Sequence, residues 1–418
     1  MYINNRNRNK EYFNWNMLLF VSLSSAAMGI YRDGFSSLFP FLQSEFDLTR
    51  AQVSLYSTLL YLTSTFFSLI SGRLVDIKGT KSSMIFGMLF VGILLIFHSI
   101  APTFYALLIL AAITGIGMSI NPSATNKGIT EWFLPRLRNT ATGIWSTSYP
   151  IGGAMAASVL PIVGTLIGWR NSVIISGSLI LLCILPIFFF YSNKNSNKKE
   201  KKTDFHENER KAISFKVGFS ELIKNNNLLA VSVFGFFLGA TEGAILTHFT
   251  LFLYLDYGLS KGMAGLGFAF CQFGSIFGRL FWGTVCDKFL NANRRKAFLI
   301  LGSIFFLITI IFGLFLKTIN PSIAILYFLA FLAGCSARGW DGLFFPSVTE
   351  IVKEEQVGMS VGFSLLFIRT GILLSPPIFG YIADIRGNYD FSWLLLGLMM
   401  FLTSFVQYIF FIKKSRKN

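Results

Sequence analysis

Twelve apolar runs of about twenty residues divide this 418-residue chain, and they restrict its fold more than any other feature. They fall at residues 16–41, 53–71, 83–100, 104–126, 141–167, 171–191, 228–255, 262–282, 297–316, 322–346, 358–382 and 391–412. Each run is long enough to cross the hydrocarbon core of a bilayer as a helix. A β-barrel is excluded because barrel strands alternate polar and apolar residues, whereas these runs are continuously apolar. The sequence therefore predicts an all-α, polytopic membrane protein with twelve transmembrane helices.

The composition supports lipid as the main solvent of the chain. Hydrophobic residues make up 53% of the sequence and charged residues only 13%, against roughly 25% charged residues in soluble domains. The net charge of +16 could suggest nucleic-acid binding. However, the basic residues lie in short segments between apolar runs and form no recognisable binding module. We expect membrane lipids, and no nucleic acid, among the partners.

Cysteine and histidine give no sign of a metal site or a disulfide framework. The four cysteines lie in or near apolar runs without a Cys-x-x-Cys pair, and the three histidines are scattered. No Gly-x-x-x-x-Gly-Lys-Ser/Thr motif is present, and no nucleotide-binding domain remains outside the apolar runs. We therefore expect no cofactor and no metal, and a solute or ion gradient as the energy source for any transport.

The basic residues also predict how the chain is oriented. With the N-terminus inside, inner segments hold 27 of the 36 Lys and Arg residues. Positive charge accumulates on the cytoplasmic side of membrane proteins, so both termini are expected in the cytoplasm and the protein in the plasma membrane, which is the inner membrane of a bacterium. The N-terminal apolar stretch also resembles a signal peptide, but it continues to Phe41 and so fits a transmembrane helix better.

The chain divides into two similar halves. A polar, Lys- and Asn-rich segment at 192–227 separates residues 1–191 from residues 228–418, and each half holds six apolar runs. Two patterns recur at equivalent positions: Gly-x-x-x-Asp followed by basic residues at Gly72–Asp76 and Gly283–Asp287, and a nine-residue glycine spacing at Gly143/Gly152 and Gly362/Gly371. Duplicated halves predict two pseudo-symmetric six-helix bundles around a central cavity.

With its six-plus-six organisation, the stretch Gly72-Arg73-Leu74-Val75-Asp76-Ile77-Lys78-Gly79-Thr80-Lys81 resembles the loop signature of the major facilitator superfamily. Ile77 and Thr80 stand where that family usually has arginine. Shorter stretches, Tyr31-Arg32-Asp33 and Gly339-Trp340-Asp341-Gly342, resemble its anion:cation symporter and monocarboxylate- or cyanate-permease branch. The resemblance covers the whole chain. It implies a transporter that works by alternating access, with Asp76 and Asp287 latching the cytoplasmic side.

We expect the glycines of this repeated motif, Gly72 and Gly283, to let a loop backbone approach a neighbouring helix closely. The acid four residues later could then face a helix N-terminus or a basic partner. An ordinary charged turn is the alternative interpretation. Gly72, Asp76, Gly283 and Asp287 are therefore the predicted gating residues.

Charged residues inside the membrane are costly and often functional. We singled out six that lie well inside the apolar runs: Arg32, Asp33, Glu242, Arg338, Asp341 and Arg369. Arg338 and Asp341 are three residues apart, so on a continuous helix they would share a face and could pair. Glu242, Asp33 and Asp341 are the predicted proton-coupling groups. Fixed ion pairs with a purely structural role are the alternative interpretation.

Arginine suits recognition of an anion because its planar guanidinium binds two oxygens. Arg32 is the first candidate ligand of an anionic substrate, with Arg338 and Arg369 as partners from the second half. The superfamily resemblance implies that the first helix of each three-helix group lines the cavity. Lesser candidates for polar or stacking contacts, each of which could equally serve packing, are Tyr31, Asn121, Asn126, Trp340 and Gln272.

The sequence thus predicts a secondary transporter, not an enzyme, that moves a small organic anion such as a carboxylate with protons and acts as a monomer. An exporter of drugs or a carrier of neutral solutes remains an alternative, although the span at 141–167 lacks the Gly-Pro step typical of drug antiporters. A membrane-embedded enzyme and a transporter-like sensor are further alternatives. The short polar loops hold no cluster of catalytic side chains, and the central polar segment holds no recognisable partner site.

Overall fold

The computed structural model describes residues 14–193, 222–315, 321–352 and 356–410. The described residues form helices and no strands. The first half comprises α1 (Trp15–Arg32), the 3₁₀ helix η1 (Phe35–Leu38), α2 (Phe39–Phe46), α3 (Arg50–Lys78), α4 (Thr80–His98), α5 (Phe104–Trp132), α6 (Pro135–Ser146), α7 (Ser148–Ile167), α8 (Trp169–Leu182) and α9 (Ile184–Phe190). The second half comprises α11 (Asn226–Leu255), α12 (Lys261–Phe289), α13 (Arg294–Ile310), the π-helical turn η2 (Ile311–Phe315), α15 (Ile323–Ala337), α16 (Asp341–Thr349), α17 (Val357–Arg386) and α18 (Asp390–Phe410).

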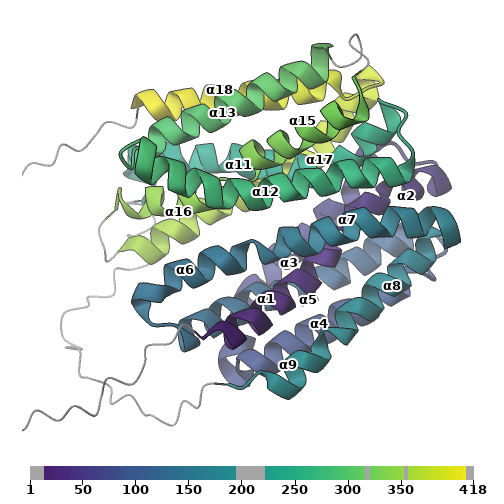
Figure 1. Ribbon diagram of the computed structural model, residues 1–418, viewed down its shortest axis with the longest axis horizontal. Coiled ribbons are helices and arrows are strands. Elements are labelled where there is room, and N and C mark those ends of the chain that lie inside the picture. The colour runs from purple at the N-terminus through teal and green to yellow at the C-terminus, as the bar shows by residue number, and fades with distance from the viewer. Residues whose placement is uncertain (1–13, 194–221, 316–320, 353–355, 411–418) are drawn as a thin grey trace, which may run out of the picture.

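In the described part of the chain, ten helices are long and apolar enough to cross a membrane, and α3, which bends by 55°, raises this to eleven. The first predicted span is broken: the chain leaves α1 after Arg32 and continues through η1 into α2. The two halves form separate bundles side by side (Figure 1). The polytopic all-α fold predicted from the apolar runs is confirmed.

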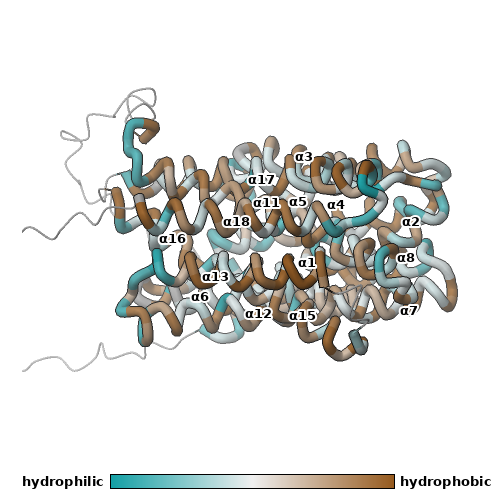
Figure 2. The backbone as a smooth tube through the Cα atoms, turned by 90° about the horizontal axis from the view of Figure 1, so that it is seen from above, coloured by the Kyte–Doolittle hydropathy of each residue, from teal (hydrophilic) through white to brown (hydrophobic). Residues whose placement is uncertain are grey.

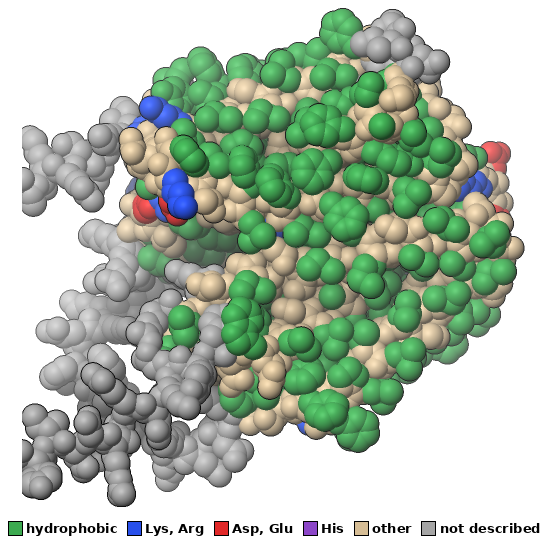
Figure 3. All heavy atoms as spheres, viewed as in Figure 1, with side chains coloured by type: hydrophobic (Ala, Val, Ile, Leu, Met, Phe, Trp, Pro, Cys, Tyr) green, Lys and Arg blue, Asp and Glu red, His purple; other side chains and the backbone are tan. Residues whose placement is uncertain are grey.

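Apolar side chains cover the middle of the face shown in Figure 3, whereas its Lys, Arg, Asp and Glu side chains gather toward the two ends. Hydrophilic backbone segments also cluster at the ends in Figure 2. We name these ends by their helices. The α2 end holds α2, the start of α3 and the last turns of α11 and α17, and the α6 end holds α6, α16 and the last turn of α3 (Figure 1).

The internal repeat is visible in how the helices pack. A Cβ atom on Gly152 of α7 would overlap the carbonyl oxygen of Ala26 in α1, and one on Gly371 of α17 would overlap that of Phe236 in α11. Gly143 and Gly362, nine residues earlier in each half, have open space around them. The same close helix crossing therefore occurs once in each bundle, as expected when small residues let membrane helices approach closely.

The positions of Gly72 and Gly283 differ from those predicted. Both lie within helices, α3 and α12, and not in loops. A Cβ atom on either glycine would meet no other atom within 4 Å. The expectation that they permit a close backbone approach is therefore wrong for this conformation, because the helices continue through the motif and the glycines face open space.

Candidate functional site

Two helix breaks near the middle of the bundle place the central charged residues. α1 ends at Arg32, with Asp33 as its C-cap, and α15 ends where Arg338 is the C-cap. Each break leaves backbone carbonyls at a helix C-terminus, where a positive side chain is favoured. Arg32 and Arg338 occupy this position in opposite halves. Discontinuous helices of this kind commonly form the binding sites of secondary transporters.

These side chains close into a four-membered ring of charges, which we call the charge ring. Glu242 of α11 lies 3.0 Å from Arg32 and 3.5 Å from Arg338, measured from Oε1 to each Nη2. Asp33 completes the ring, with 2.9 Å from Oδ2 to Arg338 Nη2 and 3.5 Å from Oδ1 to Arg32 Nε. Each half of the protein contributes one positive and one negative charge, so the two shortest links join the halves.

The members of the charge ring differ in how accessible they are. The side chains of Asp33 and Arg338 are completely buried and that of Glu242 is 6% exposed, whereas Arg32 is 23% exposed. Arg338 also donates a hydrogen bond to Gln272 of α12. Arg32 is therefore the group in the ring that a solute can reach most easily, and Arg338 is held in place by partners from three helices.

A short chain of hydrogen-bonded polar groups begins beside Arg32 at Tyr149. Its guanidinium lies 5.1 Å from the centre of the Tyr149 ring on α7. The Tyr149 hydroxyl donates to Asn121 Oδ1 at 2.9 Å, and Asn121 donates to Ser24. Asn121, predicted as a possible solute contact, thus acts in this conformation as a hydrogen-bond link between helices.

The expected pairing of Arg338 with Asp341 is wrong. The chain leaves the helix between α15 and α16, so the three-residue spacing no longer places both side chains on one face. Asp341 begins α16 and pairs instead with Arg279 of α12, at 3.0 Å between Oδ2 and Nη1. Arg279 also donates to the carbonyl of Ser146 in the other half. Arg279 is a partly buried charged residue that was not among the candidates predicted from the sequence.

Two aromatic candidates lie outside the charge ring. The Tyr31 hydroxyl is 2.9 Å from that of Tyr56, which in turn lies 3.0 Å from His98 Nε2, and all three side chains are buried within the first half. Trp340 packs edge-on against Phe344, with 5.8 Å between ring centres. The structure therefore brings neither residue to Arg32 in this conformation.

Arg369 of α17 stands apart from the other central arginines. Its Nη1 donates to Ser68 Oγ of α3 at 3.0 Å, and no carboxylate among the described residues pairs with it. The charged residue that acts on it electrostatically is Arg32, which is also positive. The other three central arginines are balanced by the acids Asp33, Glu242 and Asp341, so Arg369 gives the centre one positive charge in excess.

The predicted gating acids do not join the halves here. Asp76 is exposed and pairs with Lys127 of the same half, at 2.9 Å between Oδ1 and Nζ. Asp287 is exposed on α12. Their latching role remains a prediction for another conformation.

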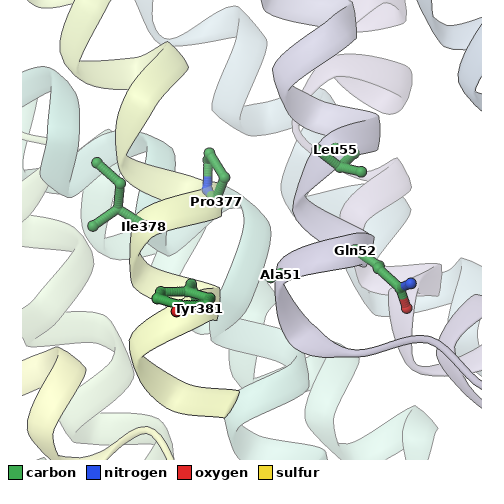
Figure 4. Close-up of a pocket in the computed structure, with 6 residues that line it drawn as sticks. All are labelled: Ala51, Gln52, Leu55, Pro377, Ile378 and Tyr381. Carbon is green, nitrogen blue, oxygen red and sulfur yellow. The ribbon is translucent and has the colours of Figure 1, made fainter. Parts of the chain in front are cut away.

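A separate apolar pocket of about 410 Å³ lies between α3 and α17 near the α2 end (Figure 4). Its lining residues are Ala51, Gln52, Leu55, Pro377, Ile378 and Tyr381. None of them belongs to the charge ring, and the exposed surfaces of Leu55, Ile378 and Tyr381 face outward from the helices. The pocket is therefore part of the lipid-facing seam between the halves and not the polar centre.

Comparison with known proteins agrees with this architecture. The family model described as Major Facilitator Superfamily matches residues 19–291 and 236–418. A probable hexose phosphate transport protein of Chlamydia trachomatis is 23% identical, over 94% of this chain and 91% of that protein. The hexuronate transporter of Bacillus subtilis is 21% identical, over 91% of this chain and 90% of that protein.

The fold is also found in a solved structure. A bacterial homologue of the human lysosomal transporter Spinster, in an inward-facing and unoccupied conformation, matches with a TM-score of 0.73 and 17% identity. The match covers 96% of this chain and 97% of the homologue. The chain therefore belongs to the major facilitator superfamily and is a multi-pass membrane transporter, not an enzyme.

Proposed function

We propose that this transporter moves a small organic anion by alternating access, in symport with protons. The observation that carries the proposal is the excess positive charge at the centre, where Arg369 has no carboxylate partner among the described residues. An isolated charge inside a membrane protein is costly unless a counter-ion compensates it. An anionic solute supplies that counter-ion only while it is bound.

Two observations support a site shared by Arg369 of the second half and Arg32 of the first, namely that Arg32 acts electrostatically on Arg369 and that both are accessible. Both side chains are partly exposed, whereas Arg338 is completely buried. A solute that binds to both halves can influence how the two halves are arranged, as alternating access requires. The named solutes of the two relatives, a hexose phosphate and a hexuronate, are both anions.

Arg369→Gln is expected to raise the KM for uptake of the anion about 10- to 100-fold in proteoliposomes. A hydrogen bond to a charged group contributes about 1.5–3 kcal/mol, and each 1.4 kcal/mol corresponds to a factor of ten in affinity. Uptake of radiolabelled hexuronate and hexose phosphate would be measured for the wild type and the variant.

Arg386→Gln provides the matched control, because it removes the same charge from the exposed last turn of the same helix. Arg369→Lys, which keeps the charge, should retain more of the uptake than Arg369→Gln. Unchanged uptake of both anions in Arg369→Gln would show that the solute binds elsewhere.

Proton coupling is proposed to depend on Glu242. Its carboxylate is the shared partner of Arg32 and Arg338, across both halves. Desolvation disfavours a charged carboxylate, and a nearby positive charge favours it. If the solute competes for Arg32, Glu242 loses part of its compensation and can take up a proton, so that anion and proton enter together.

Glu242→Gln should abolish the stimulation of uptake by an inward proton gradient, because glutamine cannot exchange a proton. Exchange of labelled for unlabelled anion across the membrane at equal pH should continue. The comparison of the two assays in the same vesicles separates loss of coupling from loss of binding. Gradient-stimulated uptake that survives in Glu242→Gln would rule out Glu242 as the proton carrier.

The proposed orientation places the α6 end in the cytoplasm of a plasma-membrane protein, because the basic loops predict it. In the structure, most of the hydrogen bonds and ion pairs that join described residues of the two halves lie at the centre and at the α2 end, and Arg279 also donates to Ser146, the residue of α6 next to α7. The conformation is therefore proposed to be open toward the cytoplasm. One chain supplies both halves of the site, which supports a monomeric transporter.

A further inference from the structure

The first turn of α3 makes an unusual contact with the other half of the protein. The backbone N–H groups of Arg50 and Ala51 donate to the two carboxylate oxygens of Asp384 in α17, both at 2.9 Å. Arg50 and Ala51 are the first two residues of α3, whose N-cap is Thr49. The first N–H groups of a helix have no partner within that helix. Asp384 therefore caps a helix of the opposite bundle.

Thr49 does not duplicate this contact. Its side chain accepts from the N–H of Gln52, and Gln52 in turn accepts from the N–H of Thr49. The local capping box thus satisfies the N–H groups of Thr49 and Gln52. Asp384 accepts from the two N–H groups between them, those of Arg50 and Ala51. A carboxylate at a helix N-terminus is also favoured by the helix dipole. The cap of α3 is complete only when the two halves meet.

Further contacts join the start of α3 to α17 and to the end of α11. The carbonyl of Arg50 lies so near Gly380 of α17 that a Cβ atom there would be 2.8 Å from its oxygen. The guanidinium of Arg50 lies 3.6 Å from Asp384 Oδ1 and 3.8 Å from Asp256 Oδ1 at the end of α11, and it donates to the carbonyl of Gly387 at 2.9 Å. Figure 4 shows Ala51 at the start of α3, facing α17.

One turn further along α3, a second polar contact joins the halves. Ser54 Oγ lies 3.0 Å from His248 Nε2 of α11 and 3.0 Å from the carbonyl oxygen of Pro376 in α17. His248 Nε2 is 2.8 Å from the same carbonyl, which can only accept, so this nitrogen carries the proton. His248 Nδ1 then accepts from the Tyr389 hydroxyl at 3.0 Å.

We propose that Asp384 is the positioning residue that keeps the α2 end shut: its carboxylate stabilises the closed arrangement by capping α3 across the interface, and the cap must break before this end can open. In the open arrangement, the N–H groups of Arg50 and Ala51 and the carboxylate of Asp384 must form hydrogen bonds to water instead. The cap therefore sets part of the equilibrium between the two access states. This inference depends on the contact between the halves and not on the identity of the solute.

The test measures the separation of the two halves at the α2 end directly. Spin labels would be attached to cysteines at Thr165 of α7 and Ser322 before α15, two exposed positions in opposite halves, with the four native cysteines replaced. Double electron–electron resonance on the full-length protein in lipid nanodiscs then gives the distance distribution. Asp384→Asn is expected to increase the ratio of the long-distance to the short-distance population about tenfold, which corresponds to about 1.4 kcal/mol and lies within the usual range for loss of a helix cap.

Asp47→Asn is the matched control, because Asp47 is exposed at the same end and the change removes the same charge. Arg50→Gln separates the cap from the ion pair: it removes the guanidinium but leaves both N–H donors. A larger long-distance population in Asp384→Asn than in Arg50→Gln supports the cap. A distribution in Asp384→Asn identical to that of Asp47→Asn, or a larger opening in Arg50→Gln, overturns it.

If Asp384 had only a structural role, replacing it would lower the thermal stability of the protein without favouring one access state. Thermal unfolding of each variant is therefore recorded beside the distances. If Asp384→Asn does not yield folded protein, Asp384→Ser is used, because its hydroxyl is too short to reach both N–H groups. The same shift toward the long distance is expected for Asp384→Ser, and its absence overturns the proposal.

Discussion

Replacing Arg338 with methionine should lower the free energy of unfolding by about 3–5 kcal/mol, because it leaves two buried carboxylates with Arg32 as the single positive charge of the ring. Arg338 is completely buried, and its guanidinium lies 2.9 Å from Asp33 and 3.5 Å from Glu242. Methionine fills much of the same volume, so the effect would come from the lost charge and not from a cavity. Thermal unfolding of purified protein, followed by tryptophan fluorescence, would measure the change.

The double variant Asp33→Asn/Arg338→Met is the decisive control. It removes one positive and one negative charge together, so the remaining pair of Arg32 and Glu242 stays balanced. The double variant should be more stable than Arg338→Met alone, although it lacks one more native side chain. If the two variants unfold at the same temperature, electrostatic balance does not explain the burial of Arg338.

The second large effect is expected at the close helix crossings. Gly152→Leu should prevent correct folding, because its Cβ would overlap the carbonyl of Ala26 and α1 cannot move away without disturbing the charge ring at its end. Overpacking commonly costs about 1–3 kcal/mol where side chains can adjust. Here the obstacle is backbone, so we expect a cost at or above that range. Fluorescence-detected size-exclusion chromatography would measure the yield of monodisperse protein.

Gly143→Leu is the matched control for this prediction, since open space surrounds that glycine. The repeat extends the same test to the second half, where Gly371→Leu should fail and Gly362→Leu should be tolerated. Equal yields for Gly152→Leu and Gly143→Leu would mean that the helices α1 and α7 are not held as closely as the structure shows.

The fold was largely predictable because the membrane simplifies the problem. An apolar run of twenty residues has few alternatives to a helix in lipid, so the spans and the division into two halves followed from the sequence. The repeated glycine spacing also predicted an equivalent feature in each half. The breaks after Arg32 and at Arg338 did not follow, because neither position holds a proline and both lie inside apolar runs.

The pairing of the charged residues was less predictable, for a physical reason. Sequence spacing gives the face of a residue on its own helix, but the partner depends on how distant helices are rotated about their axes. Glu242 meets Arg32 across the two halves, and Asp341 meets Arg279 on another helix, so local spacing could not reveal either pair. Arg279 could have been found by counting every basic residue inside the spans. The cap by Asp384 could not be predicted because it depends on which helix ends of the two halves meet, and the sequence does not give that.

The charge ring has a consequence for how the chain is made. Arg32 lies beside Asp33 in the first half, and Glu242 lies 3.5 Å from Arg338 in the second, so each half carries its own neutralising pair. A nascent first half can therefore enter the bilayer without an uncompensated charge, before the second half has been synthesised. Assembly of the two halves then adds the shorter links between Arg32 and Glu242 and between Asp33 and Arg338. Biosynthesis and association of the bundles thus become separable steps, and neither step leaves a member of the charge ring without a partner.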